Sequence, residues 1–105
     1  MPRKTRILLA DDHTVVRKGF RLILSQEPDL EVIAEAGTGR EAVRLAGELK
    51  PDVIILDIAM PDMNGVEATR RIFEADPGIR ILILSMYDDE RWLEFLQCCY
   101  LLRYV

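Results

Sequence analysis

The sequence has few of the features that mark secreted, membrane-bound or thiolate-metal proteins. Its only cysteines are the adjacent residues Cys98 and Cys99, a spacing that fits neither a disulfide framework nor a metal-ligand motif. No apolar run reaches the roughly 18 residues of a membrane span, and the opening MPRKTR lacks the apolar core of a signal peptide. We therefore expect a cytoplasmic protein without a membrane segment.

An excess of basic charge is also missing. The formal net charge is -4 at pH 7 and the pI is near 5.0, so direct binding to nucleic acid or anionic lipid is not expected. Arg3, Lys4 and Arg6 are interpreted as a solvated segment before the first strand. The sequence has 105 residues, and half of them are hydrophobic. We therefore expect one domain, residues 1–105, built around one core.

Short apolar runs alternate with helical patterns along the chain. The runs 7–10, 32–36, 53–56 and 81–84 are rich in β-branched residues and nearly without polar alternation, as is typical of parallel strands covered on both faces. Between them, apolar residues recur at helical spacing: Val16, Phe20, Ile23 and Leu24; Ala42, Val43, Ala46 and Leu49; Val66, Thr69, Ile72 and Phe73. Pro28, Pro51 and Pro77 follow the three helical stretches. This order predicts a doubly wound α/β fold with helices on both faces of a parallel sheet.

Carboxylates follow the first and third of these apolar runs. Asp11 and Asp12 come directly after the first run, and Asp57 comes after the third. Because the carboxyl ends of neighbouring parallel strands meet at one crevice, we expect the three side chains to lie close together. Such a group either holds a proton or binds a cation, and oxygen ligands suit Mg²⁺. Taken alone, Asp11 and Asp12 could equally cap the next helix. His13 is interpreted as a residue of the first helical turn and not as a ligand.

From residue 5 to about residue 91, the sequence resembles the receiver domain of bacterial two-component response regulators. The motifs that carry this resemblance are the pair Asp11-Asp12, Asp57 followed by Met60-Pro61 and Asn64-Gly65, and Ser85 after the fourth strand. Residues 11–19 and 84–87 look most like the subfamily with a LuxR-type helix-turn-helix output domain, which implies transcription regulation; no such DNA-binding segment is present in this sequence. The fold implied is a flavodoxin-like three-layer sandwich.

The resemblance implies a role for each site residue. Asp57 would accept a phosphoryl group from a sensor histidine kinase, which makes the domain a phosphoacceptor with at most slow self-dephosphorylation and not an enzyme. Asp12 and Asp57 would ligate Mg²⁺ directly, Asp11 through water, and Ala59 through its backbone carbonyl. Ser85 would donate its hydroxyl to the phosphoryl group and move the loop after the fourth strand.

A competing motif lies between the second strand and the second helix. Gly37, Gly39 and Ala42 fit the G-x-G-x-x-A pattern of a dinucleotide-binding loop, and Asp57 follows twenty positions after Gly37 (57 minus 37). A chain of this length lacks the other half of such a fold, and a nucleotide site leaves the acidic pair unexplained. A haloacid-dehalogenase-like phosphatase would need a second aspartate where this chain has Ala59.

The end of the sequence departs from the receiver pattern. Receivers continue with a fourth helix, a fifth strand, an essential Lys and a fifth helix, but here the Lys position falls beyond Val105. We therefore expect a fold truncated or altered after the fourth strand. Because 91–105 contains neither Gly nor Pro, 88–104 is predicted to form one helix, with a strand at 100–105 as the alternative.

The apolar tail 92–105 is also predicted to mediate self-association. A covering helix hides roughly 400 Å² of apolar surface, which is worth on the order of 10 kcal/mol at about 25 cal/mol per Å². A twofold dimer or a domain swap could cover a face exposed by its loss. Because the sequence lacks the family's Lys, fifth strand and fifth helix, the alternative to a working phosphoacceptor is a receiver-like interaction module with impaired phosphorylation switching.

Overall fold

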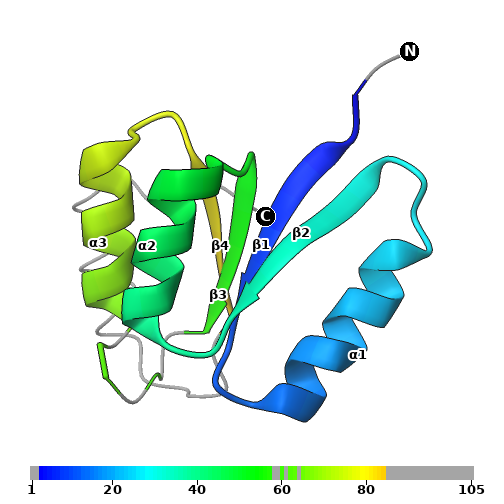
Figure 1. Cartoon of the computed structure of the whole chain (residues 1–105), viewed down its shortest axis with the longest axis horizontal. Helices are drawn as coiled ribbons and strands as arrows, with labels where there is room; N and C mark the ends of the chain where they lie inside the picture. The colour runs from blue at the N-terminus through cyan, green and yellow to red at the C-terminus, as the bar shows by residue number, and fades with distance from the viewer. Residues whose placement is uncertain (1–2, 58–59, 61, 64, 85–105) are drawn as a thin grey trace.

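The structure confirms the predicted alternation of strands and helices. The computed structural model describes residues 3–57, 60, 62–63 and 65–84. Its elements are β1 (Thr5–Ala10), α1 (Thr14–Ser25), β2 (Leu30–Ala36), α2 (Gly39–Leu49), β3 (Val53–Asp57), α3 (Gly65–Ala75) and β4 (Arg80–Leu84). The strands form one parallel sheet in the order β2-β1-β3-β4 (Figure 1). The order reverses between β1 and β3, which is the mark of a doubly wound sheet.

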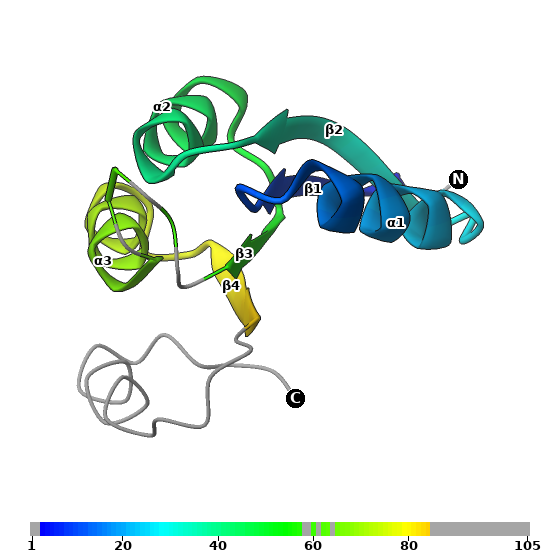
Figure 2. The ribbon, with the colours of Figure 1, turned by 90° about the horizontal axis from the view of Figure 1, so that it is seen from below.

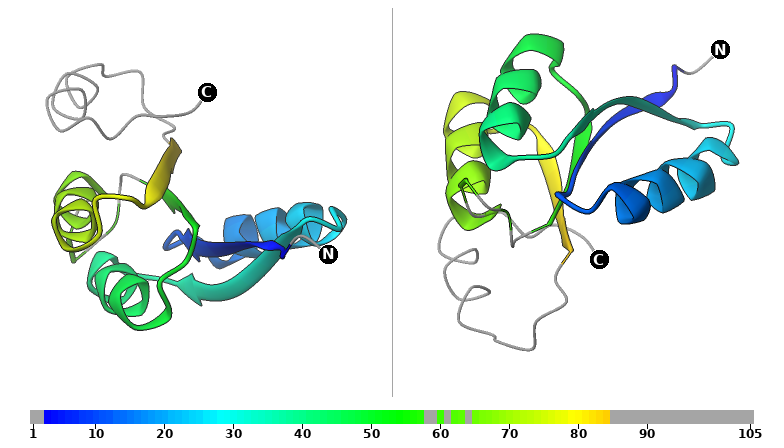
Figure 3. Two further views of the ribbon diagram at one scale, coloured as in Figure 1. Left: turned by 90° about the horizontal axis from the view of Figure 1, so that it is seen from above. Right: turned by 60° about the horizontal axis from the view of Figure 1, so that its bottom comes forward.

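Apolar residues cover both faces of this sheet. Figures 2 and 3 show α2 and α3 side by side over one face of the sheet, and α1, among the described helices, over the other. Successive residues of β1 point to opposite faces: Leu8 and Ala10 join the core under α2 and α3, whereas Ile7 and Leu9 join the core under α1. The described part of the chain is therefore a three-layer sandwich, as predicted.

The first helix contacts the sheet through fewer residues than its pattern predicts. Phe20 and Leu24 pack against the sheet core, one helical turn apart. Val16 and Ile23, which share this helical face, are 40% and 61% exposed. Both residues lie on the same side of the line that joins Phe20 and Leu24 along the helix. Because a helix is cylindrical, side chains on that side lie farther from the strands. The spacing therefore places the four residues on one face of a helix, as predicted, but of these four only Phe20 and Leu24 pack against the sheet core.

The interpretation of Arg6 as part of a solvated segment is wrong. Its guanidinium donates from Nη1 to the Lys50 carbonyl and from Nη2 to the Leu49 carbonyl, each at 2.9 Å. These carbonyls lie at the end of α2, where Lys50 adopts a left-handed conformation with φ 48°. The last carbonyls of a helix lack partners within it, so Arg6 caps α2 and ties it to β1.

A cluster of charges joins α1 to β2. Glu35 accepts hydrogen bonds from Arg17 Nε at 3.1 Å and from Arg21 Nη1 at 2.6 Å. The Arg21 bond, followed by the Arg17 bond, lowers the pKa of Glu35 although partial burial opposes the shift. The ionised carboxylate is therefore favoured in the folded state.

This shift predicts a pH dependence of stability. A carboxyl whose pKa is lowered on folding stabilises the protein above its unfolded pKa, and that stabilisation disappears as the pH falls through the folded pKa. Urea unfolding should therefore show the wild type more stable than Glu35→Gln at neutral pH. The difference should shrink as the pH falls below the ordinary Glu value of 4.5. A difference that stays constant down to the acid limit of folding would contradict this assignment.

Thr69 is a buried hydroxyl in α3 without a hydrogen-bond partner among the described residues. Its side chain is fully buried. An unpaired buried hydroxyl costs about 1–3 kcal/mol, so Thr69→Val, which keeps the shape, should raise the free energy of unfolding by about 1 kcal/mol. Urea unfolding tests this, with Thr69→Ala as the control that opens a cavity and should destabilise. A destabilised Thr69→Val would show that the hydroxyl has a partner.

Two predictions fall outside the described residues. The helix expected at 88–104 and the self-associating tail 92–105 both lie beyond Leu84, the last residue that the structure describes. Among the described residues, no helix combines the length and apolar character needed to span a bilayer.

Candidate functional site

The register of β1 against β3 brings the predicted carboxylates together. Ala10 pairs with Leu56 at the end of the ladder, so Asp11 and Asp57 are neighbours at the same edge of the sheet. Both are buried, with 8% and 6% of their surface exposed, whereas Asp12 is exposed. Ligand atoms of Asp11, Asp12, Asp57 and His13 all lie within 4.8 Å of one another. The structure thus forms the acidic crevice that the sequence predicts.

A tight turn after β1 orients Asp11. The Asp11 amide donates to the Ala36 carbonyl of β2 at 3.0 Å, and one carboxylate oxygen of Asp11 accepts from the His13 amide at 2.7 Å. The cap residue of α1 is His13, whose side chain makes no cap hydrogen bond. The helix-cap interpretation of Asp11 and Asp12 is therefore not supported.

His13 lies closer to the carboxylates than the sequence analysis predicts. Its Nδ1 is 2.9 Å from an Asp11 oxygen, 3.0 Å from an Asp12 oxygen and 3.9 Å from an Asp57 oxygen. The hydrogen bond to Asp11 and then the charge of Asp12 raise the pKa of His13. The residue precedes the first helical turn instead of lying in it. Its position next to the acidic pair in the sequence was the available signal.

The donor set of this crevice fits a divalent cation. Three carboxylates contribute hard oxygen ligands, and their mutual repulsion falls when a cation lies among them. Three of the four possible ligands are carboxylates and no cysteine lies among the described residues, a donor set that favours Mg²⁺ over softer metals. An Asp cluster that could hold a metal is therefore present.

The segment after β3 packs against the start of α2. Asp62 accepts hydrogen bonds from the Gly39 amide at 2.8 Å and the Arg40 amide at 3.1 Å. Desolvation raises the pKa of Asp62, but the bonds from Arg40 and Gly39 outweigh it and the pKa is lowered. A Cβ at Gly39 would lie 2.4 Å from the Met63 carbonyl oxygen, so only glycine permits this contact.

These contacts argue against the dinucleotide interpretation. A pyrophosphate would bind the amides at the start of α2, but Asp62 already occupies those of Gly39 and Arg40. The Gly37 amide donates to a Glu41 carboxylate oxygen at 3.0 Å. The glycines therefore serve close packing and local hydrogen bonds, and the match to G-x-G-x-x-A is coincidental.

Two predicted site residues, Ala59 and Ser85, lie outside the described residues. Leu84, which directly precedes Ser85, is the register partner of Asp57. The roles predicted for Ala59 and Ser85 stay predictions.

The sheet order and the acidic cluster at the strand ends are those of a flavodoxin-like α/β domain with a group of carboxylates that could hold a metal. The family model of the response regulator receiver domain matches residues 7–98. The chain therefore belongs to the response regulator receiver domain family of two-component signalling, as the resemblance implied.

Similar proteins agree with this assignment. The chain is 44% identical over 90 residues to the transcriptional regulatory protein DegU of Brevibacillus brevis, covering 86% of this chain and 38% of DegU. It is 51% identical over 89 residues to the oxygen regulatory protein NreC of Staphylococcus haemolyticus, covering 84% and 41%. The signal receiver domain of NarL from Mycobacterium tuberculosis superposes with a TM-score of 0.85 at 32% identity, covering 91% of this chain and 78% of that one. The chain spans about two fifths of the length of these curated relatives.

Proposed function

We propose that Asp57 accepts a phosphoryl group from a sensor histidine kinase in the presence of Mg²⁺. The observation that carries this proposal is the convergence of three aspartates from two strand ends, with ligand atoms within 4.8 Å of one another. Asp12 and Asp57 would hold the cation directly, Asp11 through water, and Ala59 through its backbone carbonyl. The domain is then a phosphoacceptor with at most slow self-dephosphorylation.

The chemistry is an in-line displacement at phosphorus. A carboxylate oxygen of Asp57 forms a bond to phosphorus as the bond to the donor histidine nitrogen breaks, and the released imidazole takes up a proton. A carboxylate is a weak nucleophile, but phosphoryl transfer depends mainly on alignment and charge neutralisation. Bound Mg²⁺ supplies the neutralising charge. Asp57 contributes the nucleophile from a buried position, which limits competing attack by water.

Phosphorylation of Asp57 must change the conformation of the domain if partner proteins are to respond to it. Ser85 would bond the phosphoryl group and draw the loop after β4 inward, and the added charge of about -1.5 to -2 drives this movement. DegU and NreC are named as regulatory proteins, and we infer that this domain controls transcription in the cytoplasm through a LuxR-type output domain. Self-association through 92–105 stays part of the proposal.

Intact-mass measurement tests this function most simply. Incubation of the folded chain with acetyl phosphate and Mg²⁺ should add one phosphoryl group, because the small donor replaces the phosphohistidine. Removal of Mg²⁺ with EDTA should prevent the addition, since the three carboxylates then repel the incoming phosphate. Absence of an adduct on correctly folded protein with Mg²⁺ present would instead favour the interaction module.

A further inference from the structure

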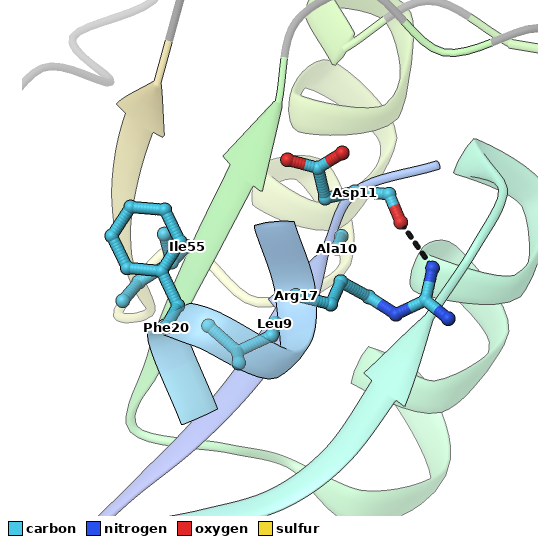
Figure 4. Close-up of a pocket in the computed structure, with 6 residues that line it drawn as sticks. All are labelled: Leu9, Ala10, Asp11, Arg17, Phe20 and Ile55. Carbon is cyan, nitrogen blue, oxygen red and sulfur yellow. Dashed lines mark hydrogen bonds between the residues drawn. The ribbon is translucent and has the colours of Figure 1, made fainter. Parts of the chain in front are cut away.

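Arg17 is an enclosed basic side chain beside the acidic crevice, and the reaction above does not use it. Its side chain is 17% exposed, compared with 50% for Arg21 one turn later. Arg17 Nη1 donates to the backbone carbonyl of Asp11 at 2.5 Å, and Nε donates to Glu35 at 3.1 Å. Figure 4 shows the Asp11 carbonyl directed at the guanidinium and the Asp11 carboxylate pointing away from it.

These bonds hold both backbone polar groups of Asp11. Its amide is tied directly to Ala36 of β2, and its carbonyl is tied to Glu35 of the same strand through Arg17. The guanidinium also lies beside Gly37, where an added Cβ would come within 3.4 Å of Nη1. The chain therefore has little freedom to rotate where it turns from β1 toward α1.

The chemistry of arginine suits this position. A charged donor makes a stronger hydrogen bond to a carbonyl than a neutral donor does. The planar fork of arginine also serves two acceptors at fixed angles, which a lysine ammonium does not. Glu35 in turn is oriented by Arg21, whose Nη1 lies 2.6 Å from the second carboxylate oxygen. A series of hydrogen bonds thus links Arg21 on the outer surface of α1, through Glu35 and Arg17, to the Asp11 carbonyl.

We propose that Arg17 is a positioning residue for the divalent-cation site. By fixing the Asp11 peptide, it aims the Asp11 and Asp12 carboxylates into the crevice, and it does so without contacting the cation or Asp57. Glu35 acts through Arg17. This inference rests on the proposed function, because the property that Arg17 controls is the affinity of the crevice for Mg²⁺.

The test compares Mg²⁺ binding among three variants of the full chain by isothermal titration calorimetry, with the folded fraction measured by circular dichroism. Arg17→Met keeps an apolar stem beside Phe20 but loses both hydrogen bonds, and its Mg²⁺ affinity should fall about 10-fold, as when other outer-sphere partners are removed. Arg17→Lys keeps the positive charge but cannot serve both acceptors, so its affinity should lie between those of Arg17→Met and wild type. Arg44→Met is the matched control, since it removes an exposed arginine of α2 whose hydrogen bonds go to Glu48 and not to Glu35 or Asp11, and its affinity should stay within about twofold of wild type.

A second measurement separates positioning from a general loss of stability. Labelling of Arg17→Met by acetyl phosphate should be slow at limiting Mg²⁺ and should return to the wild-type rate at saturating Mg²⁺. Equal Mg²⁺ affinities for folded Arg17→Met and Arg44→Met would overturn the inference and leave the proposed function intact. A wild type that binds no Mg²⁺ would overturn both. If Arg17→Met does not fold, Glu35→Gln takes its place, and wild-type affinity in that variant would overturn the inference.

Discussion

Asp57→Asn is expected to abolish the phosphoryl adduct while leaving the fold intact. The amide has nearly the shape of the carboxylate but lacks the anionic oxygen that attacks phosphorus. Asp57 lies at the end of β3, where its backbone continues a ladder that does not depend on the side chain. The measurement is intact mass after incubation with acetyl phosphate and Mg²⁺, with circular dichroism to confirm folding.

The matched control for Asp57→Asn is Asp52→Asn at the opposite end of β3. Asp52 accepts hydrogen bonds from the Arg6 amide at 2.8 Å and from Arg3 at 2.6 Å, far along the strand from the crevice. Asp52→Asn should retain the full adduct although it loses the pairing with Arg3. An adduct that persists in Asp57→Asn would place the acceptor on another residue and remove the central assignment.

Gly39→Ala is expected to destabilise the protein by about 2 to 3 kcal/mol, the range of a forced close contact. The added methyl group would lie 2.4 Å from the Met63 carbonyl oxygen and 2.9 Å from its Cβ. A backbone carbonyl cannot rotate away as a flexible side chain can, so α2 and the segment at 62–63 must separate. The bonds from the Gly39 and Arg40 amides to Asp62 would lengthen with them. Urea unfolding measures the loss.

Gly47→Ala is the matched control, because it makes the same substitution in the same helix. A Cβ at Gly47 meets no atom within 4 Å. Alanine in a helix interior is favoured over glycine by about 0.5–1 kcal/mol, so this variant should be more stable than wild type. Equal stabilities for the two alanine variants would mean that the start of α2 does not press against the segment after β3.

The fold and the acidic crevice could be predicted because their causes are local in the sequence. Unalternated apolar runs indicate strands buried on both faces, and the prolines after each helical stretch mark where the helices end. Parallel strands then place residues that follow Ala10 and Leu56 side by side. To predict that Asp57 lies beside Asp11, it was therefore enough to locate the ends of the two strands and to expect parallel pairing.

Contacts between distant segments could not be predicted in this way. Arg6 caps α2 across 44 positions of sequence, and Asp62 bonds the Gly39 amide across 23; no local pattern marks either pairing. The exposure of Ile23 depends on how far the sheet extends under α1, which helical periodicity does not encode. The proximity of His13 to the carboxylates is a local effect of the turn that Asp11 closes, and its place directly after the acidic pair was the sequence signal for it.

The most direct test of the account is a crystal of the chain soaked in Mn²⁺, with the anomalous signal used to locate the metal. We predict one strong peak at the carboxyl edge of the sheet, bonded to oxygens of both Asp12 and Asp57, and its loss when Mg²⁺ is added in excess. A crevice without a peak, or a peak held by the residues after β1 alone, would contradict the claim that the two strand ends share one cation.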